Sequence, residues 1–277
     1  MHNAALAALG LNWRYLACDV PPENLRSALA GAGALRFIGL NLTVPHKLLA
    51  FEMVEVLDES ARTWGAVNTV RFEARDERGE WRPLGAFAQS PAGEIRAHGF
   101  NTDADALIRS LREDLGLEPA GAKVLLLGAG GAGRTAALKL ATEGVAELHL
   151  LNRTRAKAEA VAAEIRQRWP GVRVALDYPA GAVDLVLNAT SLGLRTEDSL
   201  PFDSERFSLR RAAAAYDMIY RPAETPFLQA ARAAGARAAN GLGMLLYQGA
   251  KALEIWTGQP APVAVMRRAL EANIYGT

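Results

Sequence analysis

Three glycines in this sequence have the spacing of a phosphate-binding turn. Gly128, Gly130 and Gly133 form a G-x-G-x-x-G pattern between an apolar run at 123–127 and helix-forming residues at 134–140. The apolar run predicts a buried parallel strand. In such a unit the first glycine makes the turn, the second lets the backbone approach a pyrophosphate, and the third lets the helix pack on the strand. Because the helix then presents N–H groups to an anion, the sequence predicts a dinucleotide site. The residues expected to contact the cofactor here are Gly128, Ala129, Gly130, Gly131 and Ala132.

The segment after the next expected strand indicates which dinucleotide is bound. In NAD-selective sites an acid at this place binds the ribose 2′-OH. Here the place is taken by Asn152, Arg153 and Thr154, with Lys157 just beyond. The guanidinium of Arg153 can bind a 2′-phosphate with its planar fork, whereas an acid would repel it. The alternative is an ordinary basic first helical turn, which the helix dipole disfavours slightly. We therefore predict NADP rather than NAD, bound in part by Asn152, Arg153, Thr154 and Lys157.

Two residues of the first half have the chemistry that hydride transfer to a carbonyl requires. Lys47 follows the end of an expected strand at 37–44, and Asp103 begins an expected helix at 102–115. A lysine ammonium can protonate the oxygen that becomes an alkoxide when hydride reaches the carbon, and a neutral lysine can take the proton back in the reverse direction. Taken alone, Lys47 and Asp103 also fit a surface lysine and an N-terminal helix acid.

The elements that would position these residues alternate between strand and helix. From residue 123 onwards the alternation implies a parallel, doubly wound sheet with right-handed crossovers, so the fold class is α/β. In the first half, 67–72 and 81–86 read as a hairpin separated by the charged segment 73–80, and 89–97 reads as a loop. The other expected strands are 13–20, 37–44, 147–151, 172–176, 183–187, 213–219 and 236–239. The expected helices are 2–9, 22–29, 47–57, 58–63, 102–115, 154–169, 225–234, 242–256 and 263–272.

The composition is that of an ordinary globular protein. The chain has 277 residues, half of them hydrophobic, and a formal net charge of +1, which predicts neither a nucleic-acid partner nor strong attraction to a membrane. Cys18 is the only cysteine, so no intramolecular disulfide can form and the cytoplasm is the expected compartment. Cys18 itself is expected to be a small core residue. No apolar run is long enough to span a membrane, and no signal-peptide pattern opens the chain. No metal-ligand spacing is found among His2, His46, His98 and His149.

Further motifs in chain order resemble those of the shikimate dehydrogenase family. They are NLTVPHK (41–47), GAVNT (65–69), GFNTD (99–103), GAGGAG followed by Arg134, NRT (152–154), NATSLGL (188–194), YDMIYRPAETPFL (216–228) and NGLGMLLYQGA (240–250).

The resemblance implies an oxidoreductase of aromatic amino-acid (chorismate) biosynthesis that reduces 3-dehydroshikimate to shikimate with NADPH. By the same resemblance Lys47 is the acid/base and Asp103 its partner at the substrate hydroxyls. The side chains implied to bind the substrate are Thr43, Asn68, Asp103, Tyr220 and Gln248. Met218 and Gly241 are implied to border the nicotinamide.

The resemblance also implies two domains. An N-terminal substrate domain with a mainly parallel sheet is expected over 1–103, completed by C-terminal helices in 241–277. A Rossmann-type NADP domain is expected over 104–240. A homodimer is compatible with the sequence, which does not settle the oligomeric state.

The chain departs from the family pattern in two places. The family opens with a strand and a Ser-x-Ser loop that binds the substrate carboxylate, and here Met1 matches the helix that follows them. The expectation is a reading frame that begins upstream of Met1. The alternative is a defective or altered paralogue, such as a catalytically silent NADP-binding protein. A quinate/shikimate dehydrogenase is a further alternative for the function. The second departure is an extended segment at 75–97, to which we assign no function.

Overall fold

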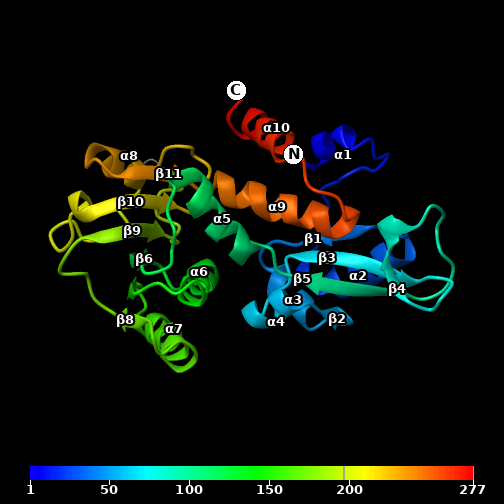
Figure 1. Ribbon diagram of the computed structural model, residues 1–277, viewed down its shortest axis with the longest axis horizontal. Coiled ribbons are helices and arrows are strands. Elements are labelled where there is room, and N and C mark those ends of the chain that lie inside the picture. The colour runs from blue at the N-terminus through cyan, green and yellow to red at the C-terminus, as the bar shows by residue number, and fades with distance from the viewer. Residues whose placement is uncertain (196, 277) are drawn as a thin grey trace. The chain divides into compact units, whose positions relative to one another are not determined.

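The computed structural model of the protein describes residues 1–195 and 197–276. These residues form two compact units (Figure 1). The first unit comprises Met1–Asp103 and Leu246–Thr277, and the second comprises Ala104–Leu245. The chain passes between them at the start of helix α5 (Asp103–Leu115) and within helix α9 (Leu242–Thr257).

The second unit is built on a six-stranded parallel sheet in the order β11-β10-β9-β6-β7-β8. Its central strand β6 is completely buried at Leu125 and Leu126, as expected for a sheet covered by helices on both faces. The strand order reverses at β6, which pairs with β7 on one side and β9 on the other, and such a switch point is where parallel sheets bind ligands. The doubly wound sheet that the sequence predicts is therefore confirmed. The strands are β6 (Lys123–Leu127), β7 (Glu147–Leu151), β8 (Arg173–Ala175), β9 (Val183–Asn188), β10 (Ala212–Asp217) and β11 (Arg237–Asn240).

The helices of the second unit follow the predicted ranges closely. Helices α6 and α7 pack against each other, and α8 packs on β10 and β11. Thr225 caps α8, because its side chain accepts a hydrogen bond from the Leu228 N–H. The bounds are α6 (Gly131–Thr142), α7 (Arg155–Arg168), η3 (Leu209–Arg211) and α8 (Pro226–Ala233).

The first unit contains a five-stranded mixed sheet. Strand β3 lies between β1 and β5 and is antiparallel to both. Strand β4 pairs antiparallel with the last three residues of β3, and β2 pairs parallel with β5. The mainly parallel sheet expected here is thus mixed, because the reversed β3 makes most of the pairings antiparallel. The expected hairpin is confirmed as β3 and β4. The strands are β1 (Gly39–Asn41), β2 (Val56–Leu57), β3 (Thr69–Arg75), β4 (Trp81–Pro83) and β5 (Ile95–Phe100).

Helices cover this sheet and close its core. Leu25 and Leu29 of α2 share a buried cluster with Val70 and Phe72 of β3. Helix α9 packs on β1, where a Cβ on Gly39 would lie 2.1 Å from the Trp256 indole nitrogen, so only glycine fits there. Helices α1 and α10 pack together. The bounds are α1 (His2–Ala8), η1 (Pro22–Asn24), α2 (Leu25–Ala34), α3 (His46–Phe51), α4 (Glu59–Trp64), η2 (Leu84–Ala86) and α10 (Val263–Tyr275).

Residues 13–20 do not form the strand that was predicted for them. No strand of the described residues pairs with this segment, and a strand needs a neighbour to pair its backbone groups. One side chain takes that role for a single residue: Asn3 Oδ1 accepts from the Tyr15 N–H at 2.8 Å, and Asn3 Nδ2 donates to the Tyr15 carbonyl at 2.9 Å. Cys18 is exposed as a result, so its prediction as a core residue was wrong.

Other predictions in the first unit had the wrong type or boundary. Val56 and Leu57, expected at the end of a helix, form β2 because they can pair with His98 and Gly99 of β5. Residues 73–75 and 95–97, expected in a charged linker and a loop, extend β3 and β5. Glu73 pairs with Arg96 and Ala74 with Ile95 across the sheet. Charge alone therefore did not exclude these residues from a strand.

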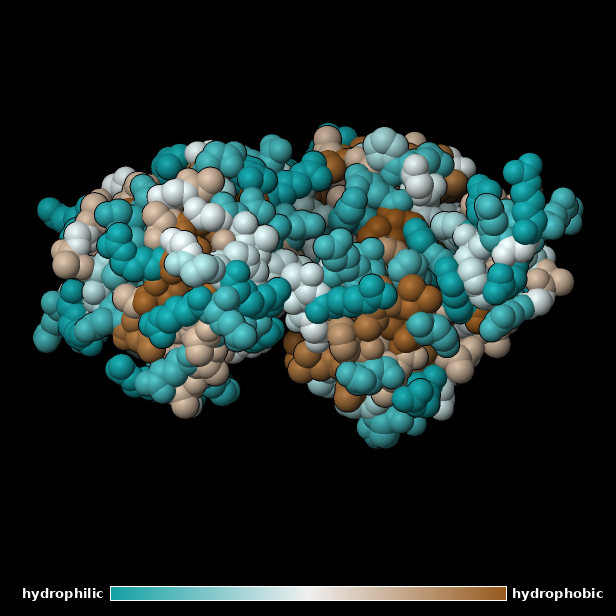
Figure 2. Space-filling view, turned by 60° about the horizontal axis from the view of Figure 1, so that its bottom comes forward, coloured by the Kyte–Doolittle hydropathy of each residue, from teal (hydrophilic) through white to brown (hydrophobic). Residues whose placement is uncertain are grey.

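The first unit also exposes large apolar side chains, and brown patches in Figure 2 show apolar residues reaching the surface. Its exposed large hydrophobic residues are Leu16, Leu35, Phe37, Val44, Leu48 and Leu49. No helix within the described ranges has both the length and the apolar character to cross a membrane.

Candidate functional site

The glycine turn of the second unit has the shape that its sequence predicts. Gly128 has φ +109°, a left-handed conformation that suits glycine, and a Cβ on Gly133 would lie 2.1 Å from the Gly128 carbonyl oxygen. A Cβ on Gly130 or Gly131 would meet nothing within 4 Å. Two glycines therefore close the turn, while the backbone of the other two faces open space.

The start of α6 offers hydrogen-bond donors toward that space. Its N-cap residue, Gly130, has no side chain to cap the first turn, and the first backbone bond back to it comes from Arg134. The preceding amide is held from the next strand, because Asn152 Oδ1 accepts from the Ala129 N–H at 2.9 Å. Uncapped N–H groups at a helix start attract anions, so the turn suits a phosphate group.

Two cations beside the turn have no ion pair among the residues that the structure describes. Arg153 and Lys157 are exposed, and no carboxylate of the described residues pairs with either of them. By contrast their neighbour Arg155 binds Glu159 at 2.9 Å. Thr154, also exposed, precedes α7, and its carbonyl accepts from Asn152 Nδ2. The charges of Arg153 and Lys157 are thus left available for an external phosphate.

The residues implied to border a nicotinamide also contact each other. The Gly241 N–H donates to the Ile219 carbonyl at 3.1 Å, and a Cβ on Gly241 would lie 2.2 Å from the Met218 carbonyl oxygen. Met218 is half-buried, and its N–H donates to the Asn188 carbonyl at 2.9 Å. Any side chain larger than hydrogen at Gly241 would displace Met218.

Asp217, the residue before Met218, is the centre of a buried hydrogen-bond network for which the sequence predicted no role. Asp217, fully buried at the end of β10, accepts hydrogen bonds from Asn188 Nδ2 at 3.0 Å, the Ile219 N–H at 3.0 Å and the Thr225 hydroxyl at 2.6 Å. Burial raises the pKa of the Asp217 carboxyl, although these hydrogen bonds oppose the shift. A signal was present in the sequence, since Asn188 and Asp217 each end an apolar strand at the edge where such sheets bind ligands.

In the first unit the structure brings Lys47 and Asp103 together. The Lys47 ammonium lies 2.8 Å from Asp103 Oδ2, and the side chains are 27% and 17% exposed. Strand pairing explains the contact, because Asn41 at the end of β1 and Phe100 at the end of β5 both pair with Thr69 of β3. Both strands therefore stop at one edge of the sheet, and the helices that follow them start side by side.

Polar side chains fix the start of α5 and so position Asp103. The Asp103 N–H donates to Asn101 Oδ1 at 3.1 Å, so the Asn101 side chain satisfies an N–H at the helix start. Asn68, only 1% exposed, donates from Nδ2 to Thr102 Oγ1 at 3.0 Å and accepts from the Thr102 N–H at 2.9 Å. Most of the hydrogen-bonding capacity of Asn68 is thus used within the protein, and direct contact with a substrate stays a prediction.

The remaining predicted substrate residues lie in different parts of the chain. Thr43 is exposed in the turn between β1 and α3, and its carbonyl accepts from the His46 N–H. Gln248 is half-buried on α9 in the first unit. Tyr220 is 38% exposed and follows β10 in the second unit. The structure brings Thr43 into the same segment as Lys47, and it leaves the other assignments as predictions.

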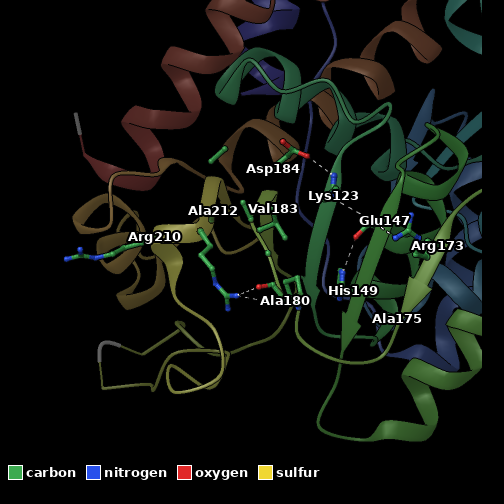
Figure 3. A pocket seen from close by; sticks show the side chains of 15 residues that line it. Lys123, Glu147, His149, Arg173, Ala175, Ala180, Val183, Asp184, Arg210 and Ala212 are labelled. Atoms are coloured by element: carbon green, nitrogen blue, oxygen red, sulfur yellow. Dashed lines mark hydrogen bonds and ion pairs between the residues drawn. The ribbon is translucent and has the colours of Figure 1, made fainter.

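A cavity of about 790 Å³ opens at the amino ends of the second sheet, on the opposite edge from the glycine turn (Figure 3). Its charged groups gather on Glu147, which lies 3.0 Å from Arg173, 3.5 Å from Lys123 and 3.6 Å from His149. Arg210 points away from this group. Since the glycine turn lies at the carboxyl ends of the strands, the cavity is not the nucleotide site that the turn predicts. Within the described ranges, no three His, Cys, Asp or Glu side chains gather in a way that could hold a metal ion.

Three segments of the chain, which include several of the candidate site residues described above, match known protein families. Residues 1–70 match the shikimate dehydrogenase substrate binding domain, 111–192 match shikimate / quinate 5-dehydrogenase, and 241–271 match the shikimate 5′-dehydrogenase C-terminal domain. A shikimate dehydrogenase (NADP(+)) of Methanopyrus kandleri is 41% identical over 98% of this chain and 89% of its own length. The chain belongs to the shikimate dehydrogenase family. The matched segments contain Lys47, the glycine turn and Gly241.

Solved structures agree with this assignment. The shikimate 5-dehydrogenase of Thermus thermophilus, determined in complex with NADP(H) and shikimate, is 35% identical with a TM-score of 0.77, covering 98% of this chain and 92% of that one. The ligand-free 5-ketofructose reductase of a Gluconobacter strain is 34% identical with a TM-score of 0.80, covering 99% and 92%. Because the second protein has a different name and substrate, similarity of this degree does not by itself fix the substrate of a family member.

Proposed function

We propose that this chain is a shikimate dehydrogenase that reduces 3-dehydroshikimate to shikimate with NADPH, and catalyses the reverse reaction with NADP⁺. The observation that carries the proposal is the 2.8 Å contact between Lys47 and Asp103 at the strand ends of the first unit. A lone surface lysine would not need such a partner, whereas an acid/base lysine must be held in place. The first unit then binds the substrate, the second binds NADP, and the enzyme acts in the cytoplasm, as its single cysteine suggests.

The residues of the pair have separate tasks in this reaction. NADPH supplies the hydride that reaches the carbonyl carbon. Lys47 gives a proton to the carbonyl oxygen as negative charge develops there, and it takes that proton back in the direction of shikimate oxidation. Asp103 holds the ammonium in position with one oxygen and can accept a hydrogen bond from a substrate hydroxyl with the other.

The glycine turn and its cations fit NADP. The N–H groups at the start of α6 suit the pyrophosphate, and the open faces of Gly130 and Gly131 leave room for it. Arg153 and Lys157, which lack ion pairs among the described residues, would bind the 2′-phosphate, with Asn152 and Thr154 beside them.

Several polar side chains complete the proposed substrate site. A polyhydroxylated ring needs convergent donors and acceptors, and a site built for hydroxyl groups rejects analogues that lack them. Thr43, Asn68, Tyr220 and Gln248 carry the hydroxyl and amide groups that such a ring requires.

Replacing Lys47 tests the proposal. In Lys47→Ala we expect turnover of shikimate with NADP⁺ to fall by about 10²- to 10⁴-fold, the usual contribution of a general acid/base, while NADP⁺ affinity stays unchanged. Steady-state kinetics and cofactor titration by fluorescence measure the two quantities. Lys251→Ala, which removes an exposed lysine of the same unit, is the control and should keep full activity.

Two results would contradict the proposal. Equal turnover by Lys47→Ala and the wild type would remove Lys47 from the reaction. A wild type that binds NADP⁺ tightly but oxidises neither shikimate nor quinate would be a catalytically silent paralogue. Faster turnover of quinate than of shikimate would instead favour a quinate/shikimate dehydrogenase.

Replacing Arg153 tests the choice of nucleotide. Arg153→Ala should weaken NADP⁺ binding by about tenfold to a hundredfold, the effect of losing a charge-assisted hydrogen bond, and should change NAD⁺ binding little. Arg155→Ala is a matched control, because Arg155 is already paired with Glu159. Equal weakening of both nucleotides would show that Arg153 does not contact the 2′-phosphate.

A further inference from the structure

The first unit contains a second cavity at the opposite end of its sheet from Lys47 and Asp103. It has a volume of about 470 Å³, within the range of small-molecule sites. The cavity lies beside the first residues of β5, Ile95 and Ala97, whereas Asp103 follows the last. At about 3.3 Å per strand residue, the length of β5 separates the cavity from the Lys47–Asp103 pair. The cavity is thus distinct from the proposed substrate site.

About half of the wall of this cavity is apolar. Leu29 of α2 and Phe72 of β3 belong to the buried core of the unit, and Met53 and Ile95 pack against it. Gly33 adds no side chain, and a Cβ there would lie 3.5 Å from the Phe72 ring. Such walls suit a flat or small apolar body.

One lining residue, Arg36, occupies a backbone position that favours glycine. The Phe37 N–H donates to the Ala32 carbonyl and the Arg36 N–H to the Gly33 carbonyl, which is the Schellman ending of helix α2. Arg36 has φ +60°, and it is the non-glycine residue with positive φ in the described part of the chain. A side chain kept in this unfavourable conformation points to a use for the side chain itself.

The guanidinium of Arg36 is also incompletely paired. Nη2 donates to the Gly93 carbonyl at 3.3 Å, but Nη1 is buried and has no hydrogen-bond partner among the described residues. A buried charged donor without an acceptor is costly, and an anion would satisfy it. A second cation, Arg26, lines the cavity and forms no ion pair within the described ranges. Glu55 also lines the cavity and accepts the Ala97 N–H at 2.7 Å, so the two arginines leave the lining with a single positive charge in excess.

From these observations we propose that the cavity binds a small organic carboxylate with an apolar body. The carboxylate pairs with Arg36, aided by Arg26 at the rim, and the apolar body contacts Phe72 and Ile95. Neither acid/base nor hydride chemistry is involved, so the proposal is independent of the function proposed above.

Titration with benzoate, followed by amide chemical shifts in nuclear magnetic resonance spectra, tests the site. The wild type should bind benzoate saturably with shift changes at Gly33, Arg36 and Ile95, and neutral benzamide should bind at least about tenfold more weakly, because it lacks the charge. Shift changes confined to Lys47 and Asp103 would overturn the proposal, since benzoate would then be binding at the catalytic pair. No saturable binding, or equal binding of benzamide, would also overturn it.

Arg36→Gly separates binding from folding, because glycine favours the left-handed position that arginine occupies. The variant should unfold at a temperature no lower than the wild type and should bind benzoate at least about tenfold more weakly. Arg78→Gly, in the exposed turn between β3 and β4, makes the same chemical change elsewhere in the unit and should bind as the wild type does. Unchanged benzoate affinity in Arg36→Gly would refute the site.

A second variant fills the cavity without touching its charge. Ala30→Phe places a ring into the space from the exposed side of α2, and it should abolish benzoate binding while leaving Arg36 in place. Retained affinity in this variant would show that benzoate binds outside the cavity.

Discussion

Two acidic side chains are buried in the described part of the chain, one in each unit, and their surroundings are opposite in kind. Glu73 of the first unit is 2% exposed and contacts three basic side chains: Arg71, Arg96 at 2.7 Å and His98 at 3.1 Å. Asp217 of the second unit is fully buried and accepts only from neutral donors. Glu73 is thus buried together with basic side chains, whereas Asp217 is buried with neutral hydrogen-bond donors alone.

The partners decide the direction in which each pKa moves. Burial alone would raise the pKa of Glu73, but hydrogen bonds from His98, Arg71 and Arg96 outweigh it and lower the pKa from 4.5 to about 2. For Asp217 burial prevails over its neutral hydrogen bonds, and the pKa is raised above 3.8. Burial by itself therefore does not tell how a carboxylate responds to pH.

The two carboxylates also join different kinds of structure. Glu73 pairs with Arg96 in the strand register, so its ion pairs link β3 to β5 within one sheet. Asp217 links the end of β9 through Asn188, the segment after β10 through Ile219, and α8 through Thr225. A charged network thus fixes a sheet in the first unit, and a neutral network fixes loops beside the proposed nicotinamide site in the second.

The largest effect on stability is expected from Glu73→Gln. The amide would leave Arg71 and Arg96 without a countercharge. Breaking a buried ion pair from one side costs about 3 to 5 kcal/mol, and because these arginines are only half-buried we expect a loss near the lower end of that range. Urea unfolding followed by circular dichroism at neutral pH measures the loss. Glu77→Gln, in the exposed turn after β3, is the control and should unfold as the wild type does. A Glu73 variant as stable as this control would mean that the ion pairs contribute nothing to stability.

The stability of the wild type and of Glu73→Gln should depend differently on pH, which tests whether charge is the reason that Glu73 differs from Asp217. Because the pKa of folded Glu73 is depressed, its contribution to stability is complete above pH 4.5 and is lost as the pH falls toward about 2. A shift from 4.5 to about 2 corresponds to roughly 3 kcal/mol. The stability difference between wild type and Glu73→Gln should shrink over this interval, measured by urea unfolding at a series of pH values. A constant difference would assign the effect to packing rather than to charge.

The sequence could not predict the role of Glu73, and the reason is physical. Glu73 was expected in a charged linker, yet two of its three basic partners are Arg96 and His98, more than twenty residues later. Only the pairing of β3 with β5 brings these charges together. The strand predicted for residues 13–20 was wrong for a related reason, because strand formation also depends on a distant partner. Their apolar pattern fits a strand, but no described strand pairs with them.

The second unit was predicted better because its signals are local. Strand β6, the glycine turn and α6 follow one another within twenty residues, and Gly128 and Gly133 each have a steric reason to be glycine. The pairing of Lys47 with Asp103 needed the family resemblance, because fifty-six residues separate them. The Asp217 network was missed although Asn188 and Asp217 both end buried strands, a position typical of functional side chains.

Asp217 provides the smallest predicted effect and the opposite sign of pH dependence. In Asp217→Asn the Oδ1 atom still accepts from Asn188 and from the Ile219 N–H. The Thr225 hydroxyl can rotate and accept from the new amide N–H instead of donating. The change should therefore cost less than about 1 kcal/mol of stability at neutral pH. Asp217→Ala is the matched variant, and it should cost about 2 to 4 kcal/mol because buried donors then lose their acceptor. As the pH rises from 3.8 through the raised pKa of folded Asp217, the wild type should lose stability relative to Asp217→Asn, since only the wild type must bury a charge. Urea unfolding across this pH range measures the difference. If the wild type instead becomes more stable relative to Asp217→Asn as the pH rises, a cation must neutralise Asp217. Asp217 and Glu73 would then not differ in the kind of partner that they have.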